Sequence, residues 1–231
     1  MKNSLSFAIG LLSAAMSGMA LAAEVPGSCA VEWTPAALSQ VLKDMPKADT
    51  QRGKVLHSSM FCASCHGVAG ESLSTNWPSL NGQRAEYTYK MLLDYQSGLR
   101  FEDAKSSMMK VEAELLTKQD MADLAAFYAA QPLPVAAHVA SVPTDKLIRK
   151  GDVASLVTPC ASCHGLHGQG GINETPALAG LPREYFIRSM ENFSNGSRHN
   201  DGVQAMRAFA KPLTREQISA LADYYAPVAD K

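Results

Sequence analysis

The clearest helical pattern along the chain lies in residues 86–98. Apolar side chains recur there at spacings of four, five and eight residues, at Tyr87, Met91, Leu92 and Tyr95. These spacings place the side chains on one face of an α-helix, and Gly98 is a natural stop. A second segment, residues 183–196, has the same character and ends in Gly196. We therefore expect two equivalent amphipathic helices.

Other segments also favour helices. Thr117 and Thr214 are good N-caps for two final helices, because each is followed three residues later by a capping partner and then by an apolar face. Two earlier helices are expected from about Thr50 into residue 62 and from about Thr144 to Cys160, and a short one at 35–43. No stretch alternates convincingly enough to be a strand, so the predicted fold class is all-α.

The second half of the chain repeats the first. A shift of 98 residues, which carries Cys62 onto Cys160, also superposes matching Gly, Pro, Leu, Tyr and Arg residues as far as Arg198. Beyond Arg198 one residue is missing, and the shift becomes 97. The repeat predicts two homologous domains, 51–131 and 146–231, joined by a Pro-containing extended linker at 132–145.

The N-terminus differs from the rest of the chain. An uncharged apolar run, residues 5–21, follows Lys2 and ends in the small-residue pattern Ala20-Leu21-Ala22. This pattern predicts a cleaved signal peptide, residues 1–22, with an uncleaved membrane anchor as the alternative. Residues 23–50 then form an N-terminal extension with no counterpart in the second copy.

Composition and charge exclude some classes of protein. The chain of 231 residues is 46% hydrophobic and carries 21 basic against 22 acidic residues. Such a balance is ordinary for a soluble globular protein, and no basic cluster favours nucleic-acid binding.

Two copies of the motif C-A-S-C-H carry the chemistry. The cysteine pairs are Cys62 with Cys65 and Cys160 with Cys163, and His66 or His164 follows each pair at once. Two thiols at this spacing add across the vinyl groups of a haem, and the adjacent histidine reaches the iron. A zinc or dithiol redox site is the competing interpretation, which the histidines, the duplication and the export signal disfavour. Two covalently bound haem c groups are therefore predicted, and Cys29 is left over.

Each haem iron needs an opposing ligand, for which methionine is the common choice in electron carriers. Met206 matches Met109 in the repeat register, whereas Met108 has no match and Met190 lies inside a predicted helix. Met109 and Met206 are therefore the predicted sixth ligands, with Met206 in a loop-like approach to the last helix. The backbone carbonyls of Pro78 and Pro176, each twelve residues after its histidine, are expected to accept the other ring proton.

For the other glycines, histidines and arginines of interest we expect roles in packing, at the surface or beside the haems. Gly53 and Gly151 are expected to let the first helix of each copy cross the last closely. The histidines without a repeated partner are expected at the surface, at positions His57, His138, His167 and His199. The repeated arginines either pair with haem propionates or end a solvated helix, at Arg100 and Arg198.

With these motifs, residues 51–228 resemble the dihaem cytochrome c4 family, built of two class I cytochrome c-like domains. The resemblance implies ligation by His66 with Met109 and by His164 with Met206, and haems packed closely enough to exchange electrons. It also implies a periplasmic electron carrier with redox protein partners. The donor would be a quinol-oxidising complex or a dehydrogenase, and the acceptor a terminal oxidase or reductase. Cys29 and the N-terminal extension depart from the family pattern.

Filled iron sites favour an electron carrier over an enzyme, because catalysis at iron needs an open position. The alternative is a dihaem subunit of a sulfur-oxidising enzyme, a thiosulfate or flavocytochrome sulfide dehydrogenase. Cys29 would then be an axial ligand in place of Met109, or the extension would be an interface. A peripheral association with the membrane stays open.

Overall fold

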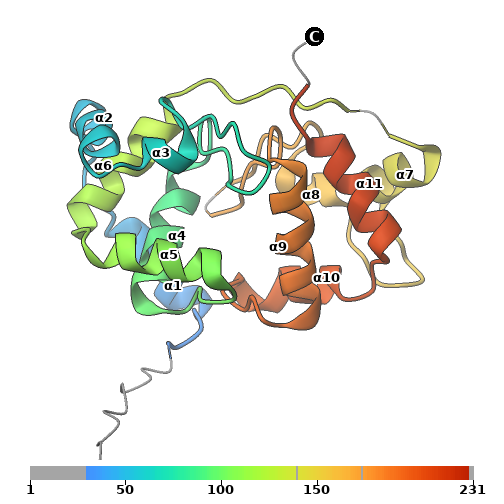
Figure 1. Cartoon of the computed structure of the whole chain (residues 1–231). Helices are drawn as coiled ribbons and strands as arrows, with labels where there is room; N and C mark the ends of the chain where they lie inside the picture. The colour runs from blue at the N-terminus through green and yellow to red at the C-terminus, as the bar shows by residue number, and fades with distance from the viewer. Residues whose placement is uncertain (1–29, 139, 173, 229–231) are drawn as a thin grey trace, which may run out of the picture.

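The computed structural model describes residues 30–138, 140–172 and 174–228, and within them the chain forms two helical lobes side by side (Figure 1). Cys29 and the predicted signal peptide lie outside the described residues. The described part holds no strand, only two isolated β-bridges. The predicted all-α class is confirmed.

The first lobe begins with the helix predicted at 35–43, which forms as expected. Its helices are α1 (Pro35–Lys43), α2 (Thr50–Ser59), α3 (Ala63–His66), α4 (Ala85–Ser97), α5 (Ala104–Glu114) and α6 (Lys118–Ala129). The second lobe contains α7 (Val142–Lys150), α8 (Cys160–His164), α9 (Arg183–Asn195), the 3₁₀ turn η1 (Gly202–Gln204), α10 (Ala205–Ala210) and α11 (Arg215–Tyr225).

Local signals set the ends of the long helices. Gly98 and Gly196 follow α4 and α9 with left-handed φ angles of 78° and 80°, a conformation that glycine adopts without steric cost. Thr117 and Thr214 begin α6 and α11, and each forms a reciprocal capping box with the residue three positions on. These predictions are confirmed.

The first lobe is built on a close crossing of α2 over α6. A Cβ added to Gly53 would lie 2.0 Å from the Asp123 carbonyl oxygen of α6, so only glycine permits the approach. The apolar faces of α4 and α6 then bury the main core, with Tyr89, Met121, Leu124 and Phe127. The expected role of Gly53 is confirmed.

The second lobe differs at the same place. Its first helix ends at Lys150, and residues 152–159 form a loop, so the helix predicted from Thr144 to Cys160 is wrong in its second half. Gly151 ends that helix with φ 69°, and its nearest neighbours are residues 157–159, not α11. The predicted crossing at Gly151 is therefore wrong, because the chain turns away where α2 would continue.

The linker runs along one side of the molecule between the lobes (Figure 1). Ser141 caps α7, which begins inside the segment predicted to be extended. Further upstream the linker pairs with the end of the chain, since Ala137 N donates to Ala226 O at 2.8 Å. No helix in the described residues is long and apolar enough to span a bilayer.

Candidate functional site: two haem-binding segments facing one cavity

The two motif histidines end the short helices α3 and α8, and both are buried. His66 Nδ1 lies 2.9 Å from the Pro78 carbonyl oxygen, and His164 Nδ1 lies 2.9 Å from that of Pro176. Burial lowers the pKa of both imidazoles, although the carbonyl contacts oppose it. Neutral rings that donate through Nδ1 leave Nε2 available for a metal. The predicted role of the proline carbonyls is confirmed.

The four motif cysteines are free thiols, and all of them line one cavity. Burial raises the pKa of Cys160 to about 11 and also raises the pKa of Cys62. Burial therefore keeps these two side chains as neutral thiols.

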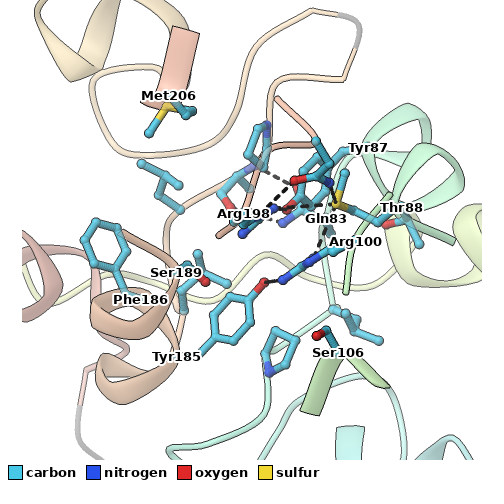
Figure 2. Close-up of a pocket in the computed structure, with 18 of the residues that line it drawn as sticks. Gln83, Tyr87, Thr88, Arg100, Ser106, Tyr185, Phe186, Ser189, Arg198 and Met206 are labelled. Carbon is cyan, nitrogen blue, oxygen red and sulfur yellow. Dashed lines mark hydrogen bonds between the residues drawn. The ribbon is translucent and has the colours of Figure 1, made fainter. Parts of the chain in front are cut away.

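The two predicted methionine ligands both line the cavity, but they lie on helices. Met109 is on α5 and half-buried, whereas its neighbour Met108 is 54% exposed. Met206 is on α10 (Figure 2), so the loop-like approach expected for it is wrong. Met190 is buried in the second core, as predicted. Other methionines also line the cavity, namely Met60, Met91, Met108 and Met190, so the choice of Met109 and Met206 still rests on the repeat register.

One cavity of about 520 Å³ extends between the lobes and is lined by both motifs, both prolines and both methionines. Hydrogen bonds between the two lobes join residues at the wall of this cavity. Gln83 Nε2 donates to Ala177 O at 3.1 Å, and Ala177 N donates to Gln83 Oε1 at 2.8 Å. Tyr185 N donates to Thr75 O at 3.1 Å. The two haem-binding segments therefore face a shared interior.

A reciprocal pair of arginine–tyrosine contacts crosses this interior (Figure 2). Arg100 Nη2 donates to the Tyr185 hydroxyl and Arg198 Nη2 to the Tyr87 hydroxyl, each at 3.2 Å. Both arginines are 4% exposed, so the solvated helix end is wrong for them. Each is bound to residues of the other lobe, which one domain taken alone could not show.

These arginines fit a cofactor that carries carboxylates. Arg100 Nη1 and Arg198 Nη2 also point at the Met91 sulfur, at 3.3 and 3.6 Å, although a thioether is a weak acceptor. Burial raises the pKa of Tyr185, but the two guanidiniums outweigh that effect and lower it to about 8. Their Nε atoms have stronger partners, since Arg100 pairs with the buried Glu102 carboxylate at 3.1 Å and Arg198 donates to Asn200 Oδ1 at 3.0 Å. The terminal nitrogens bind only tyrosine hydroxyls and the thioether among the described residues, and guanidinium nitrogens of this kind suit the propionates of haem. The residues present therefore fit the group that the motifs imply.

His57 is buried, and the expected surface position is wrong. Its Nδ1 lies 2.9 Å from the Tyr128 hydroxyl, and its Nε2 lies 2.8 Å from the Gly67 carbonyl oxygen, next to His66. The spacing of four residues from Gly53 on one helix was a usable signal, because both residues then face α6. His167 is exposed as expected, and His138 and His199 are half-buried.

The buried ion pair of Lys90 and Asp94 was not predicted from the sequence. Lys90 Nζ donates to Asp94 Oδ2 at 2.6 Å, and Trp33 Nε1 donates to Asp94 Oδ1 at 2.6 Å. Lysine and aspartate four residues apart are typical of a solvated helix face. Here both are buried against the other lobe, where the Asn200 carbonyl also accepts from Lys90.

Comparisons with known proteins show which family this chain resembles. The family model described as cytochrome c matches residues 50–129 and again 149–226. Cytochrome c4 of Thiocapsa roseopersicina is 33% identical over 180 residues, which cover 76% of this chain and 91% of that protein. The thiosulfate dehydrogenase electron acceptor of Stutzerimonas stutzeri is 29% identical over 213 residues, 87% of this chain and 97% of that protein.

Two solved structures are also similar. Reduced recombinant cytochrome c4 from Pseudomonas stutzeri aligns with a TM-score of 0.70 at 29% identity, over 79% of this chain and 100% of that one. A thiosulfate dehydrogenase from Marichromatium purpuratum aligns with a TM-score of 0.66 at 26% identity, over 77% of this chain and 40% of that one.

Proposed function

The chain belongs to the dihaem cytochrome c4 family, whose members are electron-transfer cytochromes with covalent haem c, and we propose that histidine and methionine hold both of its irons. His66 pairs with Met109, and His164 pairs with Met206. The four motif cysteines attach the porphyrins. One observation supports this proposal most. In each lobe the cavity is lined by a methionine and by a histidine whose Nδ1 is already hydrogen-bonded to a proline carbonyl.

The residues of the chain have separate tasks in this proposal. When bound, each haem supplies an iron that exchanges one electron, at a potential that a methionine ligand raises. The proline carbonyls hold the imidazoles in one tautomer and orientation. The methionines fill the position that a substrate would need, which favours transfer over catalysis. Arg100 and Arg198 hold carboxylates between the lobes.

Export to the periplasm belongs to the same proposal. It rests on the apolar run at residues 5–21 and its small-residue end. The partners are redox proteins, an electron donor and an electron acceptor. The near-neutral charge gives no basic surface for nucleic acid.

The experiment that tests the ligands is a spectrum of oxidised holoprotein. The weak far-red absorbance band reports iron–methionine bonds, so Met109→Ala and Met206→Ala should each remove about half of it. Met108→Ala is the matched control, since that exposed neighbour should leave the band unchanged. An unchanged band in either of the first two variants would show that its methionine is not a ligand.

A second candidate function is electron acceptor of a thiosulfate-oxidising enzyme. The relative named thiosulfate dehydrogenase electron acceptor favours it, because it matches 87% of this chain. In that role the chain should stay oxidised with thiosulfate alone and be reduced when a thiosulfate dehydrogenase is added. Direct reduction by thiosulfate would instead indicate catalysis in this chain. Cys29→Ser should then abolish that reduction and alter the spectrum.

A further inference from the structure

The segment before the first haem domain contacts both lobes. We call residues 30–48 the N-terminal strap. It packs apolar side chains on the first core, namely Trp33, Val41, Leu42, Met45 and Ala48. At its start, Glu32 accepts two hydrogen bonds from Arg207 of α10, at 2.9 and 2.8 Å. The strap therefore links the first lobe to the helix that carries Met206.

The two methionine-bearing helices are built differently. In the first lobe α5 has 11 residues, and Asp103 closes a capping box at its start. In the second lobe α10 has only 6 residues and its N-cap residue, Gln204, makes no side-chain capping bond, although Asp201 Oδ2 accepts from Arg207 N at 2.9 Å. Val203 and Gln204 precede it with φ angles of 50° and 59°, a strained conformation, above all for a β-branched residue. The helix of Met206 has less local support than that of Met109.

Arg207 of α10 binds both a residue of its own lobe and a residue of the N-terminal strap. Its Nε donates to Asp201 Oδ1 at 2.7 Å while its two terminal nitrogens bind Glu32. The hydrogen bonds from Arg207 are the main cause that lowers the pKa of Glu32. The counterpart of Arg207 in the first copy is Lys110, which pairs with Glu114 of its own helix. Arg207 therefore links α10 to the N-terminal strap, whereas Lys110 pairs within α5.

The contacts that each methionine helix receives from the opposite lobe also differ. Arg188 of the second lobe reaches Asp103, the cap of α5, at 3.3 Å and donates to Asn76 O at 2.9 Å. Its counterpart in the repeat, Lys90, binds Asp94 and the carbonyl oxygen of Asn200, the counterpart of Asp103. The opposite lobe therefore contacts a side chain that caps α5, but only a backbone carbonyl ahead of α10.

We propose that the N-terminal strap is a positioning element for Met206, which acts through the Glu32–Arg207 pair to keep α10 against the second haem site. The proposal rests on the proposed ligand role of Met206. Arg207 is adjacent to Met206, so restraint of its side chain restrains the backbone that carries the thioether. Trp33, hydrogen-bonded to buried Asp94, anchors the strap to the first lobe.

The test uses oxidised holoprotein labelled with ¹³C-methyl methionine and titrated with imidazole, which binds iron only when methionine leaves. The shifted methyl signals of Met109 and Met206 report each iron separately. Loss of a partly exposed pair should raise imidazole affinity about threefold to fivefold at the Met206 iron in Glu32→Gln. Glu114→Gln, which breaks the counterpart pair on α5, is the matched control and should leave the Met206 iron unchanged.

Two outcomes overturn the proposal, and they differ from failure of the ligand assignment. Equal affinities at the Met206 iron in wild type and Glu32→Gln would show that the strap does not position it. So would an equal change at both irons, which would report general loosening. Trp33→Phe keeps the ring but loses the hydrogen bond, and should change the same iron. If wild type has no shifted Met206 signal, the ligand assignment itself is wrong.

Discussion

The crossing of α2 over α6 predicts a large effect for Gly53→Ala. The added Cβ would lie 2.0 Å from the Asp123 carbonyl oxygen, 2.6 Å from its carbon and 2.9 Å from Phe127 Cβ. Ordinary contact begins at 3.4 Å, so the shortfall against the oxygen is about 1.4 Å. The obstacle is helix backbone, which cannot rotate away as a side chain can. The two helices must therefore separate.

The free energy of unfolding should fall by about 1–2 kcal/mol. Overpacking of a core costs about 1–3 kcal/mol, and a rigid obstacle favours the upper part of that range. Alanine returns about 1 kcal/mol through its better helix propensity. Separation of the helices also strains the contact between His57 on α2 and Tyr128 on α6, which adds to the loss.

Chemical denaturation of the holoprotein, followed by far-ultraviolet circular dichroism, measures this loss. Lys54→Ala is the matched control, because it raises helix propensity at the next, exposed position without touching α6. Gly53→Ala should unfold at a lower denaturant concentration than both wild type and this control. A Gly53→Ala protein as stable as Lys54→Ala would refute the close crossing.

Two further predictions concern single side chains. Tyr128→Phe leaves the buried His57 Nδ1 unpaired and should lower the free energy of unfolding by about 1–3 kcal/mol. Tyr225→Phe removes a hydroxyl that has no partner among the described residues, so it should lower that free energy little. Thermal unfolding of the two variants compares them. Because the hydrogen bonds from Arg207 lower the pKa of Glu32 in the folded chain, the unfolded chain binds the proton more tightly. The pair therefore stabilises above the unfolded pKa of about 4.3 and loses its effect as pH falls through the folded pKa. Unfolding midpoints of wild type and Glu32→Gln should differ at neutral pH and converge in acid.

The sequence predicted those features that depend on neighbours along the chain. The helix at residues 86–98 and its glycine stop follow from side-chain spacing and one backbone conformation. The Pro78 and Pro176 acceptors follow because each lies twelve residues after its histidine, in the connection that follows the same short helix. The match between Met109 and Met206 follows from the repeat alone. None of these requires knowledge of how the lobes pack.

Features that depend on contacts between distant segments were missed or misread. Arg100 was open to interpretation as the end of a solvated helix, but it is buried and donates to the hydroxyl of Tyr185, 85 residues away. Trp33 showed no pattern, because its partner Asp94 lies 61 residues further on. A charged residue is expected at the surface by default, and only the partner that buries it overrides that expectation.

The differences between the two copies carry as much information as the matches. The residue missing after Arg198 shortens the path to Met206, and there the chain has a short helix after two left-handed residues, where the first copy has the long, capped α5. The extension, absent from the second copy, contacts that same short helix through Glu32 and Arg207. A deletion that weakens one methionine helix and an added segment that holds it form one compensating pair. Sequence comparison registers them as two unrelated departures from the repeat, since only the folded chain brings position 32 beside position 207.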